Sequence, residues 1–223
     1  MDLAQLAVFV RPPAEGLVKT RLADELGNAG AAALYRAFVD DTLTLCERLR
    51  EIGRIELTLW ASGLDDPAVT EWGRRLGTVP RLQPEGNLGQ RMSAAFEEGH
   101  RRYERVVIIG SDVPTLPLGL VVDAFDALER SSIVLGPSND GGYYAIGATN
   151  DVRPAFDGVR WSTPSALTDT LEANPGVRVS LLAPWYDVDD PRDLAILRAH
   201  LSTNPAAARA TARCLAERGI AQR

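Results

Sequence analysis

Three aspartates stand where the chain could hold a divalent cation. Asp112 ends the segment Gly110-Ser111-Asp112, which directly follows four β-branched apolar residues, Val106–Ile109. Far along the chain, Asp187 and Asp189 are two residues apart, so on extended backbone their carboxylates point the same way. Mg²⁺ takes oxygen ligands, usually one or two carboxylates together with substrate phosphates. The pattern predicts a site for Mg²⁺ or Mn²⁺ with Asp112, Asp187 and Asp189 as ligands and Ser111 beside it.

The same aspartates also have a purely structural explanation, which the sequence leaves open. Aspartate often caps a turn or the first turn of a helix. Asp112 precedes a proline-containing turn, and the acidic segment 187–193 surrounds the start of an expected helix. Capping accounts for some of the carboxylates in that segment, but it does not easily account for all of them.

A cationic loop is expected directly after the first strand. Arg11, two prolines and Gly16 precede Lys19 and Arg21. α/β folds commonly bind phosphate groups at this position, so this loop predicts a site for a phosphorylated ligand. The loop is not a P-loop, because the spaced glycines and the Gly-Lys-Ser/Thr ending are missing. The alternative is a solvated basic turn.

Two glycine-containing segments could bring backbone close to a ligand. Asn87-Leu88-Gly89 precedes an expected helix, whose N-terminus can receive an anion or the edge of a base, although Asn87 could equally be only an N-cap. Asp140-Gly141-Gly142 permits positive φ angles and a close approach of the backbone. As a hairpin turn it needs no function. Its place in the chain nevertheless predicts that it lies at the same sheet edge as Asp112.

The elements that must position these residues alternate between strand and helix. Strands are expected at 6–10, 55–60, 79–83, 106–109, 133–137, 143–147 and 177–182, and helices at 29–50, 68–76, 89–103, 118–130, 165–173, 191–200 and 205–220. Strands that are apolar at every position suit a parallel sheet covered by helices on both faces. Ligands of such sheets bind beyond the carboxyl ends of the strands.

Two local details follow from the helix pattern. Ser162 or Thr163 is expected to be the N-cap of the helix at 165–173, with Pro164 in its first turn. Asp40 and Asp41, inside the helix at 29–50, are expected to be charges on its exposed face.

The composition argues against several classes of function. A net charge of −6 does not favour nucleic acid or an anionic membrane as a partner. Two cysteines rule out a disulfide framework, and two histidines argue against a zinc site or a Ser-His-Asp triad. No apolar stretch approaches the roughly 20 residues of a membrane span. With no basic segment before the first apolar run, a cytoplasmic protein is expected.

Five ordered segments resemble one family. They are Phe9 to Leu22 with its Val-Lys-Thr-Arg-Leu, Asn87 to Met92, Gly110 to Pro114, Asp140 to Tyr144, and Trp185 to Asp189. Together they look like the bacterial GT-A-like transferases labelled radical-SAM/selenodomain-associated transferases, whose biochemical role is largely unassigned. The resemblance implies one α/β domain at 1–201 with the nucleotide-diphospho-sugar transferase fold, a mixed and mostly parallel sheet with helices on both faces. Residues 202–223 are expected to form a helical extension.

More distantly, the chain is similar to guanylyltransferases acting on phospholactate or phosphoenolpyruvate and to molybdenum-cofactor nucleotidyltransferases. That similarity implies that Lys19 and Arg21 bind a triphosphate and that Asp112 and Asp189 bind the metal. It also implies that Asn87 and Gly89 lie near the base. The glycine-rich first loop of sugar-nucleotide pyrophosphorylases is absent, so their substrates are not carried over.

These observations support three hypotheses. The first is a Mg²⁺-dependent nucleotidyltransferase, which joins a nucleotide to a small phosphorylated or carboxylated acceptor and releases pyrophosphate. The second is a glycosyltransferase using a nucleotide-sugar, with Asp140 as a base on the acceptor side. The third is a nucleotide-binding partner subunit without turnover. The expected catalytic residues are Lys19, Arg21, Asp112 and Asp140, and the expected nucleotide contacts are Arg11, Gly16, Lys19, Arg21, Asn87, Gly89, Ser111, Gly141 and Gly142.

Overall fold

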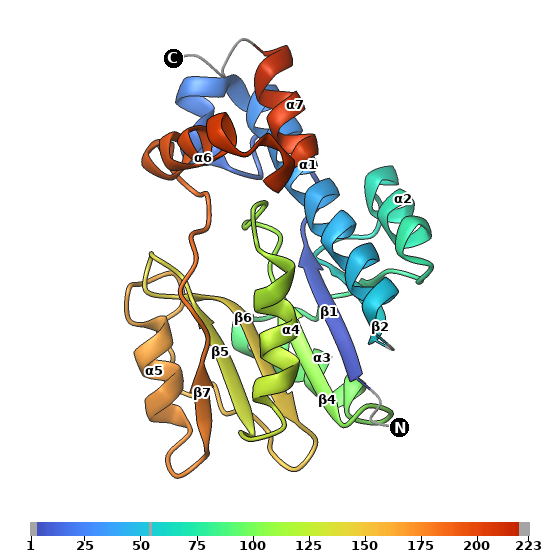
Figure 1. Cartoon of the computed structure of the whole chain (residues 1–223), viewed down its shortest axis with the longest axis vertical. Helices are drawn as coiled ribbons and strands as arrows, with labels where there is room; N and C mark the ends of the chain where they lie inside the picture. The colour runs from blue at the N-terminus through green and yellow to red at the C-terminus, as the bar shows by residue number, and fades with distance from the viewer. Residues whose placement is uncertain (1–3, 54, 219–223) are drawn as a thin grey trace.

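Strands and helices alternate along the chain, as the sequence predicts (Figure 1). The computed structural model describes residues 4–53 and 55–218. The strands are β1 (Ala4–Val10), β2 (Ile55–Ala61), β3 (Arg81–Leu82), β4 (Arg105–Ile109), β5 (Ile133–Pro137), β6 (Tyr143–Thr149) and β7 (Val179–Leu181). The helices are α1 (Ala23–Ile52), α2 (Pro67–Leu76), α3 (Leu88–Gly99), α4 (Leu118–Ala127), α5 (Ala166–Ala173), α6 (Pro191–Thr203) and α7 (Arg209–Glu217). Short 3₁₀ turns lie at Thr20–Leu22 and Pro205–Ala207.

The strands form one mixed sheet in the order β3-β2-β1-β4-β6-β5-β7. β6 is antiparallel to β4 and β5, and every other neighbouring pair is parallel. This confirms the expected mostly parallel sheet. Because β1, β4 and β5 run the same way, the loops that follow them meet at one edge. That edge is where the sequence places Lys19, Asp112 and Asp140.

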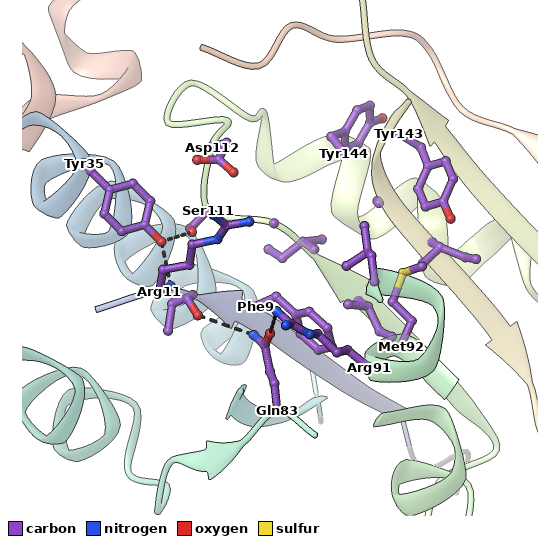
Figure 2. A pocket seen from close by; sticks show the side chains of 17 residues that line it. Phe9, Arg11, Tyr35, Gln83, Arg91, Met92, Ser111, Asp112, Tyr143 and Tyr144 are labelled. Atoms are coloured by element: carbon purple, nitrogen blue, oxygen red, sulfur yellow. Dashed lines mark hydrogen bonds between the residues drawn. The ribbon is translucent and has the colours of Figure 1, made fainter. Parts of the chain in front are cut away.

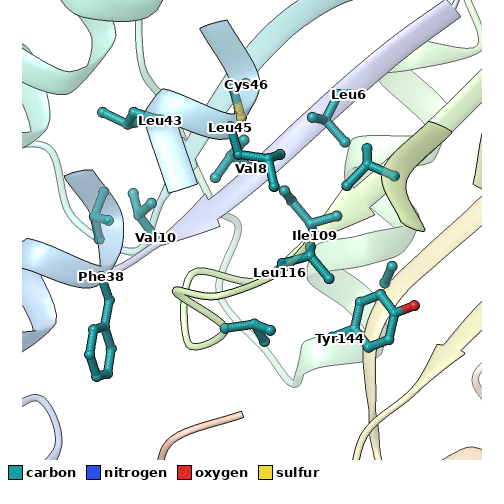
Figure 3. Packing of buried hydrophobic residues seen from close by; sticks show 14 of the residues in the cluster. Leu6, Val8, Val10, Phe38, Leu43, Leu45, Cys46, Ile109, Leu116 and Tyr144 are labelled. Carbon is teal, nitrogen blue, oxygen red and sulfur yellow. The ribbon is translucent and has the colours of Figure 1, made fainter. Parts of the chain in front are cut away.

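Helices cover both faces of the sheet. Alternate residues of the same strands therefore point into two separate hydrophobic cores, one on each face. On one face, Leu6, Val8 and Ile109 pack with residues of α1 such as Phe38 and Leu43 (Figure 3). This larger core also receives side chains from α2, α4, α6 and α7. On the other face, the intervening strand residues pack against α3 and α5. No helix among the described residues is long and apolar enough to cross a membrane.

The expected helix at 29–50 is present but is preceded by one more turn. Within α1, Gly27 has φ 69° and ψ 163°, so the chain breaks between a first turn at Ala23–Leu26 and the long regular part. The positive φ is readily adopted only by glycine. This break lets the 3₁₀ turn and the first helical turn lie beside α6 and α7 at one end of the molecule (Figure 1).

Asp41 is not on the exposed face of its helix, which corrects the expectation for that residue. It is 8% exposed, and its two carboxylate oxygens accept hydrogen bonds from the backbone N–H groups of Ala210 (2.9 Å) and Thr211 (2.8 Å). These donors belong to the first turn of α7 and would otherwise lack partners. A residue of α1 thereby caps a helix about 170 positions later, and α7 joins the larger core through Ala208 and Leu215.

We expect Asp41→Ala to lower the free energy of unfolding by about 1–2 kcal/mol, because it leaves two helix N–H groups without an acceptor. Urea unfolding at neutral pH measures the change. Glu51→Ala, which removes an exposed carboxylate from the same helix, is the matched control. Equal stability of the two variants would contradict the capping role.

Candidate functional site

One ammonium group lies between two carboxylates at the carboxyl edge of the sheet. Lys19 is the only lysine in the chain. Its Nζ pairs with the carboxylate of Asp112, which follows β4, and with Oδ1 of Asp189 at 2.6 Å. The Lys19 side chain is 4% exposed, whereas those of Asp112 and Asp189 are 47% and 46% exposed. Three segments that are distant in sequence therefore meet at one charged point.

The charges of this cluster stabilise one another. Burial alone would lower the pKa of Lys19, but Asp112 and Asp189 outweigh it and raise that pKa above its ordinary value. Burial would raise the pKa of Asp189, but Lys19, followed by Arg21 and Arg11, holds that pKa below its ordinary value. The Lys19 ammonium and the Asp189 carboxylate are thus charged at neutral pH.

Helix capping explains only part of the acidic segment before α6. The side chain of Asp190 accepts from the backbone N–H of Asp193 at 3.2 Å, and the Asp193 carboxylate accepts from the N–H of Asp190 at 3.1 Å. These two residues form a capping box at the start of α6. The carboxylates of Asp187 and Asp189 take no part in it. Capping and ligand binding therefore use different residues of the same segment.

Asp187 is a third carboxylate near the cluster, and its burial and pKa suit a cation ligand. Its Oδ1 is buried with no hydrogen-bond partner. Burial, followed by the carboxylates of Asp140 and Asp189, raises the pKa of Asp187 to about 7. Carboxylate oxygens are suitable ligands for a hard divalent cation. However, no three acidic, histidine or cysteine side chains in the described part of the chain are already grouped as metal ligands. The residues fit a cation whose coordination is completed by another molecule.

A polar cavity of about 440 Å³, here called the outer cavity, opens at this cluster. It combines the loop after β1 with Asp112, Asp189 and Asp140, and Arg11 and Arg21 add positive charge to its wall. Asp140 accepts from the N–H of Gly142 at 2.8 Å and from the hydroxyl of Ser138, so its own turn holds the carboxylate in place. A wall with three cations can hold several phosphate oxygens.

A second cavity of about 220 Å³, here called the inner cavity, continues between the ends of the strands (Figure 2). Phe9, Tyr143 and Met92 supply apolar and aromatic surface. Gln83 and Arg91 add polar groups to the same wall (Figure 2). Other lining residues are Val10, Leu88, Ile108, Ile109, Gly110, Ser111, Tyr144, Ala145 and Ile146. Such a mixture suits a flat ring that is fixed by a few hydrogen bonds.

Arg11, Tyr35 and Asp112 line both cavities, which therefore form one continuous site. The Tyr35 hydroxyl accepts from the backbone N–H of Arg11 at 2.8 Å and shares a hydrogen bond of 2.9 Å with the Ser111 hydroxyl. Burial and the nearby Asp112 raise the pKa of Tyr35 to about 12, so it stays neutral. Through these contacts α1 fixes the loop after β1 against the end of β4.

Seven of the residues that the sequence singles out line these two cavities: Arg11, Lys19, Arg21, Ser111, Asp112, Asp140 and Asp189. The remaining predicted residues line neither cavity, although Asp187 and Gly142 lie close to Asp140: Gly16, Asn87, Gly89, Gly141, Gly142 and Asp187. Asn87 is the N-cap of α3, with its side chain accepting from Gln90 N–H at 3.0 Å. A Cβ on Gly89 would meet Phe156 at 2.6 Å, and one on Gly141 would meet the Pro164 backbone at 2.2 Å.

Several lining residues were not predicted. Ser162, Thr163 and Pro164 line the outer cavity and do not start α5, whose N-cap is Ser165 without a side-chain bond. The expected cap was wrong because the Thr163 hydroxyl donates to Arg160 O at 2.7 Å in a turn before the helix. Tyr35, Gln83 and Arg91 were not predicted as site residues either. A polar side chain at a core-facing position of an otherwise apolar element is the signal that could have indicated Tyr35.

Comparisons with known proteins identify the fold and the family. A crystal structure from Desulfovibrio desulfuricans G20, provisionally named a nucleotide-diphospho-sugar transferase, is 32% identical, with a TM-score of 0.88 over 99% of this chain and 97% of that one. The fold is therefore the GT-A-like nucleotide-diphospho-sugar transferase fold. A manganese complex of a Mycobacterium tuberculosis H37Rv protein shares the fold at 16% identity, with a TM-score of 0.52 over 88% of this chain and 98% of that one.

Two curated enzymes are distant relatives. The phosphoenolpyruvate guanylyltransferase of Sphaerobacter thermophilus is 27% identical over 82% of this chain and 87% of its own length. The 2-phospho-L-lactate guanylyltransferase of Methanothermobacter thermautotrophicus is 27% identical over 82% of this chain and 79% of its own length. Residues 44–163 match a family model described as an uncharacterized protein conserved in bacteria (DUF2064), and the chain belongs to this family.

Proposed function

We propose that this protein is a metal-dependent nucleotidyltransferase. The observation that carries the proposal is the Lys19 ammonium between Asp112 and Asp189, beside Arg11 and Arg21 at the carboxyl edge of the sheet. Carboxylates for a cation and cations for phosphates are the two requirements of nucleotidyl transfer, in which positioning and electrostatics provide most of the catalysis. The distant similarity to two guanylyltransferases supports the same reaction class.

The outer cavity takes the triphosphate in this proposal, and the inner cavity takes the base. Lys19, Arg21 and Arg11 bind phosphate oxygens and stabilise the charge that develops on the departing pyrophosphate. Asp112 and Asp189, with Asp187 near them, would hold Mg²⁺ or Mn²⁺, and that cation would neutralise further phosphate charge. An anionic oxygen of the acceptor attacks the α-phosphorus, the bond from that phosphorus to the bridging oxygen breaks, and pyrophosphate leaves. Asp140 and the turn 162–164 face the acceptor.

The test is pyrophosphate release. The protein is incubated with Mg²⁺, each of the four common nucleoside triphosphates and a small phosphorylated acid, with phosphoenolpyruvate and 2-phospholactate as the first candidates. Acceptor-dependent release of pyrophosphate from at least one triphosphate is expected. No release from any of them would reject the proposal.

A glycosyltransferase is the second candidate. It is favoured by the provisional name of the 32% identical relative and by the position of Asp140 in the outer cavity, where a base for an acceptor hydroxyl would be needed. This reaction releases a nucleoside diphosphate from a nucleotide-sugar and forms no pyrophosphate. Analysis of the released phosphates therefore separates the two functions.

The base is read by Gln83 and Arg91 in this proposal. The Gln83 amide donates to the backbone carbonyls of Trp60 (2.9 Å) and Val10 (3.3 Å), which leaves its Oε1 as a fixed acceptor. The Arg91 guanidinium lies next to that oxygen, with Nη1 at 3.4 Å, and provides donors. The Gln83 oxygen as acceptor and the Arg91 N–H groups as donors would pair with a base whose edge presents a donor and an acceptor in the matching order.

We expect Arg91→Met to reduce the preference for the best triphosphate over the next by about tenfold or more, because one hydrogen bond to the base is lost. Affinity for inorganic tripolyphosphate should stay within about twofold of the unaltered protein. Competition binding measures both quantities. Arg102→Met, which removes an exposed cation just beyond the end of α3, is the control. Unchanged base preference would exclude Arg91 from base recognition.

A further inference from the structure

Lys19 occupies the place that the proposed function gives to a metal ion. Its Nζ contacts both Asp112 and Asp189, two of the three carboxylates that line the outer cavity. The side chain is 4% exposed and passes 5.7 Å from the centre of the Phe38 ring. A compact ammonium suits this position between two carboxylates better than a planar guanidinium does. Lys19 is also the only lysine among the 24 lysine and arginine residues of the chain.

A divalent cation cannot use the same carboxylates while the ammonium remains between them. Entry of the cation breaks both ion pairs and leaves the ammonium in a confined position, where like charges repel strongly. The described residues provide no alternative cluster of three or more acidic, histidine or cysteine ligands. The free ion therefore competes with Lys19 for Asp112 and Asp189.

A polyphosphate removes this conflict. The outer cavity is lined by Lys19, Arg21 and Arg11, so phosphate oxygens that enter it supply new acceptors for the ammonium. Lys19 also has a left-handed backbone conformation with φ 48°, which is unfavourable for a residue with a side chain. The ion pairs with Asp112 and Asp189 help to hold this conformation, so their loss allows the backbone at Lys19 to relax.

We propose that Lys19 is an internal competitor of the metal, so that the site takes up its divalent cation only as a complex with a polyphosphate. Binding of the phosphates draws the ammonium away from Asp112 and Asp189, and these two carboxylates would then be free to hold the metal of the complex. This inference rests on the proposed function, because it assigns the metal and the phosphates to the same cavity. It adds that the polyphosphate binds together with its cation, and that the ion pairs of Lys19 with Asp112 and Asp189 break when the phosphates bind.

The single lysine allows a direct observation of this exchange. In protein labelled with ¹³C-lysine, the signal of the Lys19 side chain is followed by NMR. We expect millimolar Mg²⁺ alone to leave the signal in place and equimolar Mg²⁺ and inorganic tripolyphosphate to shift it. A shift with Mg²⁺ alone equal to that with the mixture would overturn the proposal.

A second measurement uses Mn²⁺ alone as the probe, with free Mn²⁺ detected by electron paramagnetic resonance. We expect Lys19→Met to bind Mn²⁺ about tenfold more tightly than the unaltered protein, because two charge-assisted contacts no longer compete. Arg21→Gln removes a neighbouring cation that makes no ion pair with these carboxylates and should gain no more than about twofold. Equal affinity of Lys19→Met and the unaltered protein would contradict competition.

Thermal unfolding shows whether the variants are folded, and Lys19→Gln replaces Lys19→Met if the methionine variant is not. The outcome is independent of the pyrophosphate assay. If Mn²⁺ binds more tightly to the variant but no triphosphate yields pyrophosphate, competition stands and the proposed reaction fails. If pyrophosphate is released but Mn²⁺ affinity does not change, the competitor role of Lys19 fails alone.

Discussion

Replacing Asp112 by alanine is expected to abolish the metal-dependent part of nucleotide binding and to reduce turnover by about a thousandfold or more. The variant loses a carboxylate that pairs with Lys19 at the end of β4 and that lines both cavities. Isothermal titration with a nucleoside triphosphate, in the presence of Mg²⁺ and of a chelator, measures the effect. Mg²⁺ is expected to strengthen binding to the unaltered protein, and in Asp112→Ala the two affinities should be equal.

The control for this experiment is Asp126→Ala, which removes an exposed carboxylate from α4 in the same part of the chain. It should retain the full effect of Mg²⁺. If Asp112→Ala also retains it, Asp112 is not a metal ligand. Asp112 would then act only as the ion-pair partner of Lys19, and its backbone carbonyl, which accepts from Val188 N–H at 3.0 Å, would remain its link to the acidic segment.

The sequence predicts the fold well because its signals are local. Apolar runs such as Val106–Ile109 become buried strands, and the turn Asp140-Gly141-Gly142 joins β5 to the antiparallel β6. The order of the strands in the sheet depends on contacts between distant segments, and no local pattern contains it. For the same reason, Asp41 was assigned to an exposed face, although α7 packs over it and takes its carboxylate as a cap.

The charged part of the site was predictable and much of its wall was not. Lys19, Asp112 and Asp189 each follow a recognisable element, and loops after parallel strands meet at one edge. Tyr35 lies inside α1 and Gln83 directly follows a strand of two residues, and their roles arise from the orientation of a side chain toward segments far away in sequence. The sequence context of Asn87 fits both a cap and a ligand contact, and the structure shows its side chain used in the cap.

Replacing Lys19 by alanine is expected to weaken binding of a nucleoside triphosphate by about tenfold to a hundredfold and binding of the corresponding nucleoside by less than about twofold. The ammonium lies in the outer cavity, where the phosphates are assigned, and does not line the inner cavity assigned to the base. Titration of each variant with both ligands in the presence of Mg²⁺ measures the difference. An equal loss for both ligands would mean that Lys19 acts only through the structure of its loop.

Two further variants make the interpretation specific. Arg74→Ala, which removes an exposed cation from α2, should bind both ligands as the unaltered protein does. Lys19→Arg keeps the charge, but the 4% exposed side chain has little room for a planar guanidinium, so it should not restore triphosphate affinity. Restoration by arginine would show that charge alone is required. Failure of arginine together with normal stability would show that the compact shape of the ammonium is needed, as expected for a group that exchanges places with a metal ion between Asp112 and Asp189.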